Sequence, residues 1–169
     1  MLTVYIIKTP DPGRKHEVLR ANLKKMPIVG PTAAEHPAQV PHAGSGKIRL
    51  GGWYVNVTYA DDYAFALITR EPFGIDAEKV KPRNAQMKRV LARLLSKEIC
   101  TDTDFFKAWT TMEAQVKYYG DKSLFDALTG MWKPNPALQT KLLMYKGHVV
   151  AITSTKSNIN NQNISFRQI

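Results

Sequence analysis

Residues 53–80 alternate apolar and polar side chains with a period close to two, which is typical of β-strands. Two turn-like breaks, at residues 61–62 and 70–72, divide the stretch and predict a three-stranded antiparallel meander. In the third strand, FGIDAEKV, alternate residues share a face, so Asp76 and Glu78 should emerge side by side. Because carboxylates are depleted in strands and costly to bury alone, the fold must supply a partner for both.

The segment after this strand predicts an amphipathic helix within residues 84–100. A basic helical face is usually solvated, and its functional interpretation is a docking surface for an acidic helix of another protein. The predicted buried stripe comprises Met87, Val90, Leu91, Leu94 and Leu95, and the basic face comprises Arg89, Arg93 and Lys97.

A second helix is predicted to begin at Thr101 or Thr103, either of which can cap it, and to run to about Gly120. Glu113 and Lys117 lie one turn apart at the edge of its apolar stripe, so a third carboxylate is held on a rigid element at the border of the core. The stripe comprises Phe105, Trp109, Met112 and Val116.

The rest of the chain predicts further strands and one more helix. A short strand over residues 3–7 precedes a helix over 14–26 and an irregular segment rich in proline and glycine; strands within 141–155 and 164–169 close the chain. Strands and a helix thus occur once in each half. We predict an α+β fold of two pseudo-symmetric lobes, residues 1–75 and 76–169, each a small antiparallel sheet packed with a helix, in one compact unit.

Composition limits the classes of protein. A chain of 169 residues with 44% apolar and 22% charged residues can build a core. Its single cysteine, Cys100, and the lack of a long apolar run predict a cytoplasmic protein with no membrane partner. The net charge of +10 favours an anionic partner, which could be a nucleic acid, a nucleotide or an acidic protein. No nucleic-acid-binding motif is recognisable, so a nucleic-acid partner is not expected.

Asp76, Glu78 and Glu113 together would offer an all-oxygen site of the kind that Mg²⁺ prefers, completed by phosphate oxygens and water. The alternative is that Asp76 and Glu78 pair with some of the 24 Lys and Arg residues at the surface. Spacing alone leaves both interpretations open.

Two motifs, FGIDAEKVKP and FFKAWTTMEAQVKYYGDKSL, resemble the signature motifs of the 4′-phosphopantetheinyl transferase superfamily, in the two-lobed form that serves siderophore, surfactin and polyketide synthases. The upstream strand NVTYADDYAFALI is similar to the family's N-[IV]-S-H-S strand, and Gly46-Lys47 precedes it as in relatives. The resemblance covers residues 44–125 well and the C-terminal strands loosely.

The resemblance implies an enzyme that transfers 4′-phosphopantetheine from coenzyme A to a serine of an acyl or peptidyl carrier protein, with Mg²⁺ on the pyrophosphate. It implies a monomer that binds an acidic carrier protein. Carried over by position, the roles are these: Asp76, Glu78 and Glu113 hold Mg²⁺; Glu113 or a bound water takes the serine proton; Lys117 stabilises phosphate charge; and Gly46, Lys47, Thr58, Tyr59 and Lys117 contact coenzyme A.

Two positions differ from the family pattern. Tyr59 stands where the family has a histidine that contacts the 3′-phosphate of coenzyme A, and Met112 stands where it has a lysine near the pyrophosphate. The alternative function is therefore a non-catalytic member of the superfamily that binds a nucleotide or a partner protein.

Overall fold

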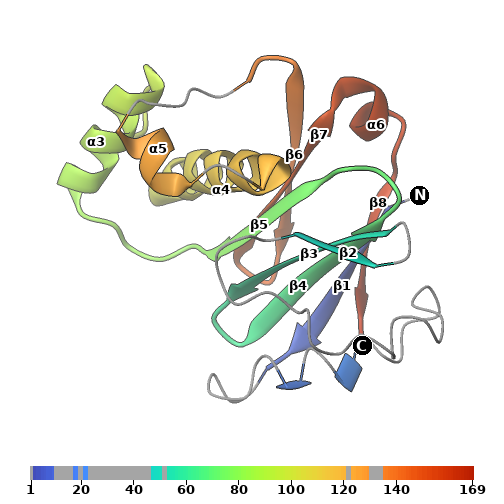
Figure 1. The fold of residues 1–169 in the computed structure, drawn as a ribbon. Coiled ribbons are helices and arrows are strands. Elements are labelled where there is room, and N and C mark those ends of the chain that lie inside the picture. Colours follow the sequence, from blue (N-terminus) through green and yellow to red (C-terminus); the bar gives the residue numbers. More distant parts are fainter. Residues whose placement is uncertain are drawn as a thin grey trace.

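The computed structural model describes residues 2–9, 17–18, 21–22, 47–50, 53–120, 123–129 and 135–169, and for 47–50 the backbone only. It is an α+β fold of two lobes, each built on a small β-sheet (Figure 1). The predicted fold class is therefore confirmed. Within the predicted helix 14–26, the four described residues are helical, and the remainder lies outside the described residues, as does the predicted irregular segment up to residue 46.

The first sheet has the strand order β2-β3-β4-β1-β8. Its neighbours pair antiparallel except for β1 and β8, which run parallel. The prediction that each sheet is antiparallel is thus wrong at this one pair. The strands are β1 (Leu2–Lys8), β2 (Lys47–Leu50), β3 (Trp53–Ala60), β4 (Tyr63–Thr69) and β8 (Ile164–Gln168).

The second sheet is antiparallel, with the order β5-β7-β6. Its long hairpin turns at Lys146-Gly147, as predicted, where both residues have a positive φ. The strands are β5 (Gly74–Lys79), β6 (Leu138–Tyr145) and β7 (His148–Thr155). The helices whose bounds are described are α3 (Ala85–Leu95), α4 (Asp102–Tyr119), α5 (Leu124–Leu128) and α6 (Lys156–Asn160).

The predicted meander is wrong in its third strand. β3 and β4 form the predicted hairpin, but β5 pairs with β7 of the second sheet. The physical reason is that β4 already has β3 on one edge and β1 on the other, so neither edge is open to β5. β5 is the edge strand of the second sheet, and it also contacts β3 of the first sheet.

The two sheets pack face to face around an inner cluster that contains Phe65 and Leu67 of the first sheet and Ile75 and Ile152 of the second. On the far side of the second sheet, α4 lies across β5 and β7 and buries a helix-side cluster around Phe106 (Figure 1). β8 comes from the C-terminal part of the chain yet belongs to the first sheet, so the two sheets are also joined through the chain's last strand.

α4 begins where the sequence predicts it. The Thr101 hydroxyl accepts from the Asp104 amide, and the Asp104 carboxylate accepts from the Thr101 amide, which forms a capping box. Glycine at position 120 ends the helix with a φ of 78°. Phe105 and Met112 of the predicted stripe are buried, and Trp109 and Val116 are partly buried.

α3 buries less than the sequence predicts. Leu91 is buried, and Leu94 and Leu95 pack against the helix-side cluster, but Met87 is exposed and Val90 is 58% exposed. The reason is that, among the described residues, α3 packs chiefly on α4, so one narrow side of it is covered. No helix among the described residues is long and apolar enough to cross a membrane.

Candidate metal centre

β5 delivers two carboxylates to one side of the second sheet. Ile75 and Ala77 face the inner cluster between the sheets, so the alternating Asp76 and Glu78 face α4, as the sequence predicts. Asp76 is only 2% exposed, whereas Glu78 is half-buried. Because β5 is the edge strand, its acids can be reached both from α4 and from β3.

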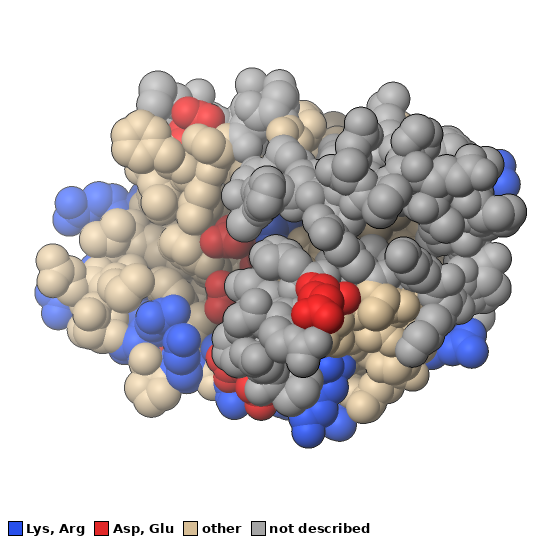
Figure 2. All heavy atoms as spheres, turned by 60° about the horizontal axis from the view of Figure 1, so that its bottom comes forward, with Lys and Arg blue, Asp and Glu red and all other residues tan. Residues whose placement is uncertain are grey.

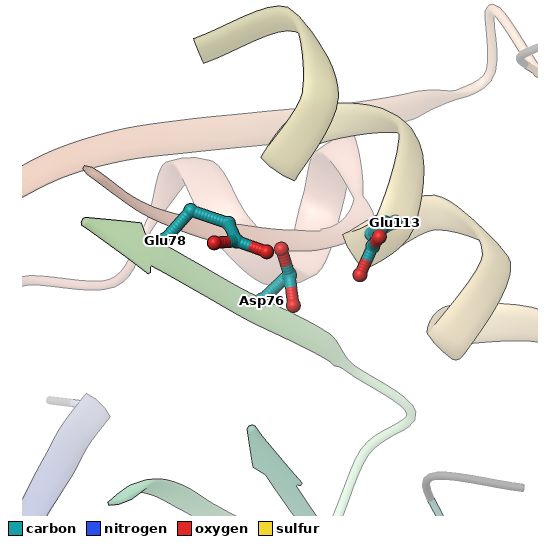
Figure 3. Close-up of side chains that lie close together, drawn as sticks. All are labelled: Asp76, Glu78 and Glu113. Carbon is teal, nitrogen blue, oxygen red and sulfur yellow. The ribbon is translucent and has the colours of Figure 1, made fainter. Parts of the chain in front are cut away.

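α4 supplies the third carboxylate. Figure 3 shows Glu113 on α4 pointing toward Asp76 and Glu78 on β5. One carboxylate oxygen of each of the three residues lies within 4.8 Å of the others. Two ligands of an octahedral Mg²⁺ ion lie about 3 to 4 Å apart, since each Mg–O distance is about 2.0–2.1 Å. The observed spread is close to that range, so small side-chain movements would bring the oxygens onto one ion.

Gly74 explains why the strand and the helix approach so closely. A Cβ atom at this position would clash with the carbonyl oxygen of Ala114 and would lie 2.6 Å from the amide nitrogen of Tyr118. Only glycine leaves room for the α4 backbone at this distance. The glycine of the FGID segment therefore sets the approach of Glu113 to Asp76.

Lys117, one turn beyond Glu113, reaches the same carboxylate. Its Nζ lies 2.7 Å from Asp76 Oδ1, and this ion pair is largely buried, with the lysine side chain 23% exposed. The same ammonium donates to Thr58 Oγ1 at 3.0 Å, and Thr58 Oγ1 donates to Asp76 Oδ1 at 2.9 Å. The alternative that Asp76 pairs with a basic residue is thus realised, but inside the protein and not at the surface.

The second carboxylate oxygen of Asp76, Oδ2, indicates whether a cation fits the site. Among the described residues, no amide, hydroxyl or cationic group donates to Asp76 Oδ2, although the atom is buried. A buried acceptor without a donor is costly, and a hard divalent cation would satisfy it. The all-oxygen donor set of Asp76, Glu78 and Glu113 therefore fits a cation of the Mg²⁺ class.

The charges of the three acids oppose one another. Burial, together with the negative charge of Asp76, raises the pKa of Glu113 to about 8, and Lys117 offsets part of this rise. A protonated Glu113 carboxyl donates to Asp76, which raises the pKa further. Burial and the charge of Asp76 also raise the pKa of Glu78. One lysine does not balance three carboxylates, so the site binds either protons or an additional cation.

Thr58 is brought to the acids, but two other predicted positions are not. On β3, Thr58 faces β5, and the alternating Tyr59 packs on the opposite side, against an outer cluster that includes Tyr5 and Ile7. Met112 is 2% exposed in the helix-side cluster, so it faces the core and not the carboxylates. A lysine at that position would have to enter the core.

The remaining predicted contacts lie at the margin of the described structure. Gly46 lies outside the described residues. Lys47 begins β2, where it is opposite Asn56 of β3; its side chain is not among those described. These positions stay predictions.

Acidic side chains also gather at the surface. In Figure 2, Asp and Glu side chains run down the middle of one face, and Lys and Arg side chains lie around them. Arg89 and Arg93 on α3 and Lys97, just beyond its end, are exposed, so the predicted basic face is accessible.

The sequence matches no protein-family model, and no curated protein matches it significantly. The chemistry of the site therefore follows from its own residues. Sequence reasoning did not find the role of Gly74 or the bond between Thr58 and Asp76. For Gly74, the signal was a glycine inside a strand, which often marks a close backbone approach.

Proposed function

We propose that the protein is a Mg²⁺-dependent 4′-phosphopantetheinyl transferase that acts as a monomer in the cytoplasm on an acidic carrier protein. The observation that carries the proposal is the buried Asp76 carboxylate, whose Oδ2 has no amide, hydroxyl or cationic donor among the described residues and which lies beside Glu78 and Glu113. The motifs that contain these residues are the ones that resemble the family.

Asp76, Glu78 and Glu113 would hold the divalent cation, which, when bound, neutralises charge on the pyrophosphate of coenzyme A. Lys117 contributes a second positive charge. Two of its three N–H groups donate hydrogen bonds to Asp76 and Thr58, and the described residues provide no acceptor for the third. We assign this N–H to a phosphate oxygen of the substrate.

Glu113 would act as the base. The carrier serine gives its hydroxyl proton to Glu113, and the serine oxygen bonds to the phosphorus that carries the pantetheine arm. The bond from that phosphorus to the bridging oxygen breaks, and adenosine 3′,5′-bisphosphate leaves with the electron pair.

The test is incubation of the full chain with coenzyme A, MgCl₂ and a panel of apo carrier proteins, followed by intact-mass measurement. We expect one phosphopantetheine to be added, with loss of modification in Asp76→Asn and Glu113→Gln. Glu71→Gln, an exposed acid between β4 and β5, is the matched control and should retain activity. Mg²⁺-dependent binding of coenzyme A without modification of any carrier would favour the non-catalytic alternative; absence of coenzyme A binding would overturn the transferase proposal.

A further inference from the structure

We propose that Thr58 is a positioning residue that orients Asp76 for a divalent cation, an inference that rests on the cation site of the proposed function. Thr58 belongs to β3 of the first sheet, whereas Asp76 belongs to β5 of the second. Its side chain is 5% exposed and meets both the Asp76 carboxylate and the Lys117 ammonium. Thr58 thus serves the acidic cluster and does not need to contact coenzyme A.

The direction of each hydrogen bond follows from the chemistry of the three groups. Lysine has no acceptor, so the bond of 3.0 Å between Lys117 Nζ and Thr58 Oγ1 runs from the lysine to the hydroxyl. The single hydroxyl proton of Thr58 is then available for Asp76 Oδ1, which lies 2.9 Å away. Lys117 itself donates to the same oxygen at 2.7 Å.

The two oxygens of Asp76 consequently have different tasks. Oδ1 is held by two donors that come from β3 and α4, and Oδ2 receives no amide, hydroxyl or cationic donor among the described residues. A carboxylate with one oxygen fixed by two donors cannot rotate freely, so its other oxygen keeps a fixed direction. Groups that hold a metal ligand in this way typically change metal affinity about 10- to 100-fold when they are removed.

A neighbouring side chain provides the comparison with a purely structural contact. Asn56 lies on the same face of β3 and is 2% exposed, and its Nδ2 donates to the backbone oxygen of Phe73 at 3.0 Å. This bond joins β3 to the segment before β5, as Thr58 joins it to Asp76, but it touches none of the acids. Asn56 is therefore the matched control for loss of a buried polar contact between the sheets.

The experiment titrates the full chain with Mn²⁺ and measures free Mn²⁺ by its electron paramagnetic resonance signal, with urea unfolding of each variant alongside. We expect Thr58→Val to bind Mn²⁺ about 10- to 100-fold more weakly than the parent. Thr58→Ser, which keeps the hydroxyl, should restore affinity to within a few-fold. Asn56→Ala should lose stability but keep its affinity. If Thr58→Val does not fold, Thr58→Cys replaces it, because a thiol is a weak donor.

The outcomes separate the two ideas. Parent-like affinity in Thr58→Val, or equal weakening in Thr58→Ser, would overturn the positioning role while leaving the cation site intact. An equal loss of affinity in Asn56→Ala would also overturn it, since general loosening of the sheets would then explain the effect. Failure of the parent to bind Mn²⁺, or unchanged binding in Asp76→Asn, would overturn the cation site and the role of Thr58 with it.

Discussion

Lys117 Nζ and Asp76 Oδ1 lie 2.7 Å apart in an ion pair that joins α4 to the edge strand β5. The carboxylate is 2% exposed, and two further acids, Glu78 and Glu113, lie beside it. The lysine therefore neutralises only one of the three charges that the acids carry when all are ionised, and it holds the helix to the strand at the point where the candidate cation site forms.

We predict that Lys117→Met destabilises the cation-free protein by about 3 kcal/mol, because removing one partner of a buried pair leaves the other charge uncompensated. Urea unfolding in EDTA measures the effect. Lys107→Met, which removes an exposed lysine of the same helix, is the control, and an equal loss of stability there would contradict the prediction.

We predict that Glu113 makes the stability of the cation-free protein depend on pH. Its pKa is raised from 4.5 to about 8 in the folded protein, chiefly by burial and by Asp76, so the folded state binds this proton more tightly than the unfolded state. The stabilisation that comes from protonated Glu113 is complete below about pH 4.5 and is lost as the pH rises to about 8. Urea unfolding of the cation-free protein should show this decline, and saturating Mn²⁺ should reduce it.

Glu113→Gln is expected to flatten the decline in that window, because the amide does not titrate. Glu71→Gln, at an exposed position, should leave it unchanged. A parent protein whose stability is constant or rises between pH 5 and about 8 would contradict the assigned direction.

The local features of the site could be predicted from the sequence. The alternation within FGIDAEKV places Asp76 and Glu78 on one face, and one helical turn places Glu113 and Lys117 together, as the structure has them. Each of these depends only on the period of one element. The capping box at Thr101 is likewise local.

Features that depend on the choice of neighbour could not be predicted. The period of a strand does not reveal which strand it pairs with. β5 pairs with β7, which lies far along the chain, although β4 precedes it directly. The bond between Thr58 and Asp76 depends on which sheet faces which, and the exposure of Val90 on how little of α3 is covered. Tertiary packing decides such points.

Gly74 gives a prediction about the contact between strand and helix. Gly74→Ala forces the α4 backbone away from β5, and overpacking of this kind costs about 1–3 kcal/mol. The movement should also weaken Mn²⁺ binding, since Glu113 moves with α4. Gly147→Ala is the control: it has a φ of 78° and open space around it, so it is strained in the backbone but should leave Mn²⁺ affinity unchanged. Unaltered affinity in Gly74→Ala would contradict the prediction.

The basic face of α3 gives a prediction about the carrier protein of the proposed reaction. Arg89 and Arg93 are exposed on α3, and positive charges at the rim of an interface mainly accelerate encounter with an acidic partner. The double variant Arg89→Glu, Arg93→Glu should slow carrier modification about tenfold at low salt, with Mn²⁺ and coenzyme A affinity unchanged.

Salt dependence and a second double variant separate this local effect from net charge. At 1 M salt the Debye length falls from about 10 Å to about 3 Å, so the difference between the parent and the α3 variant should shrink. The double variant Lys156→Glu, Arg167→Glu changes the net charge by the same amount at two exposed positions on α6 and β8, away from α3 (Figure 1). Modification rates measured by intact mass decide the point: equal slowing in both double variants would assign the effect to the charge of the whole protein, and no slowing in either would show that the basic face of α3 is a solvated surface.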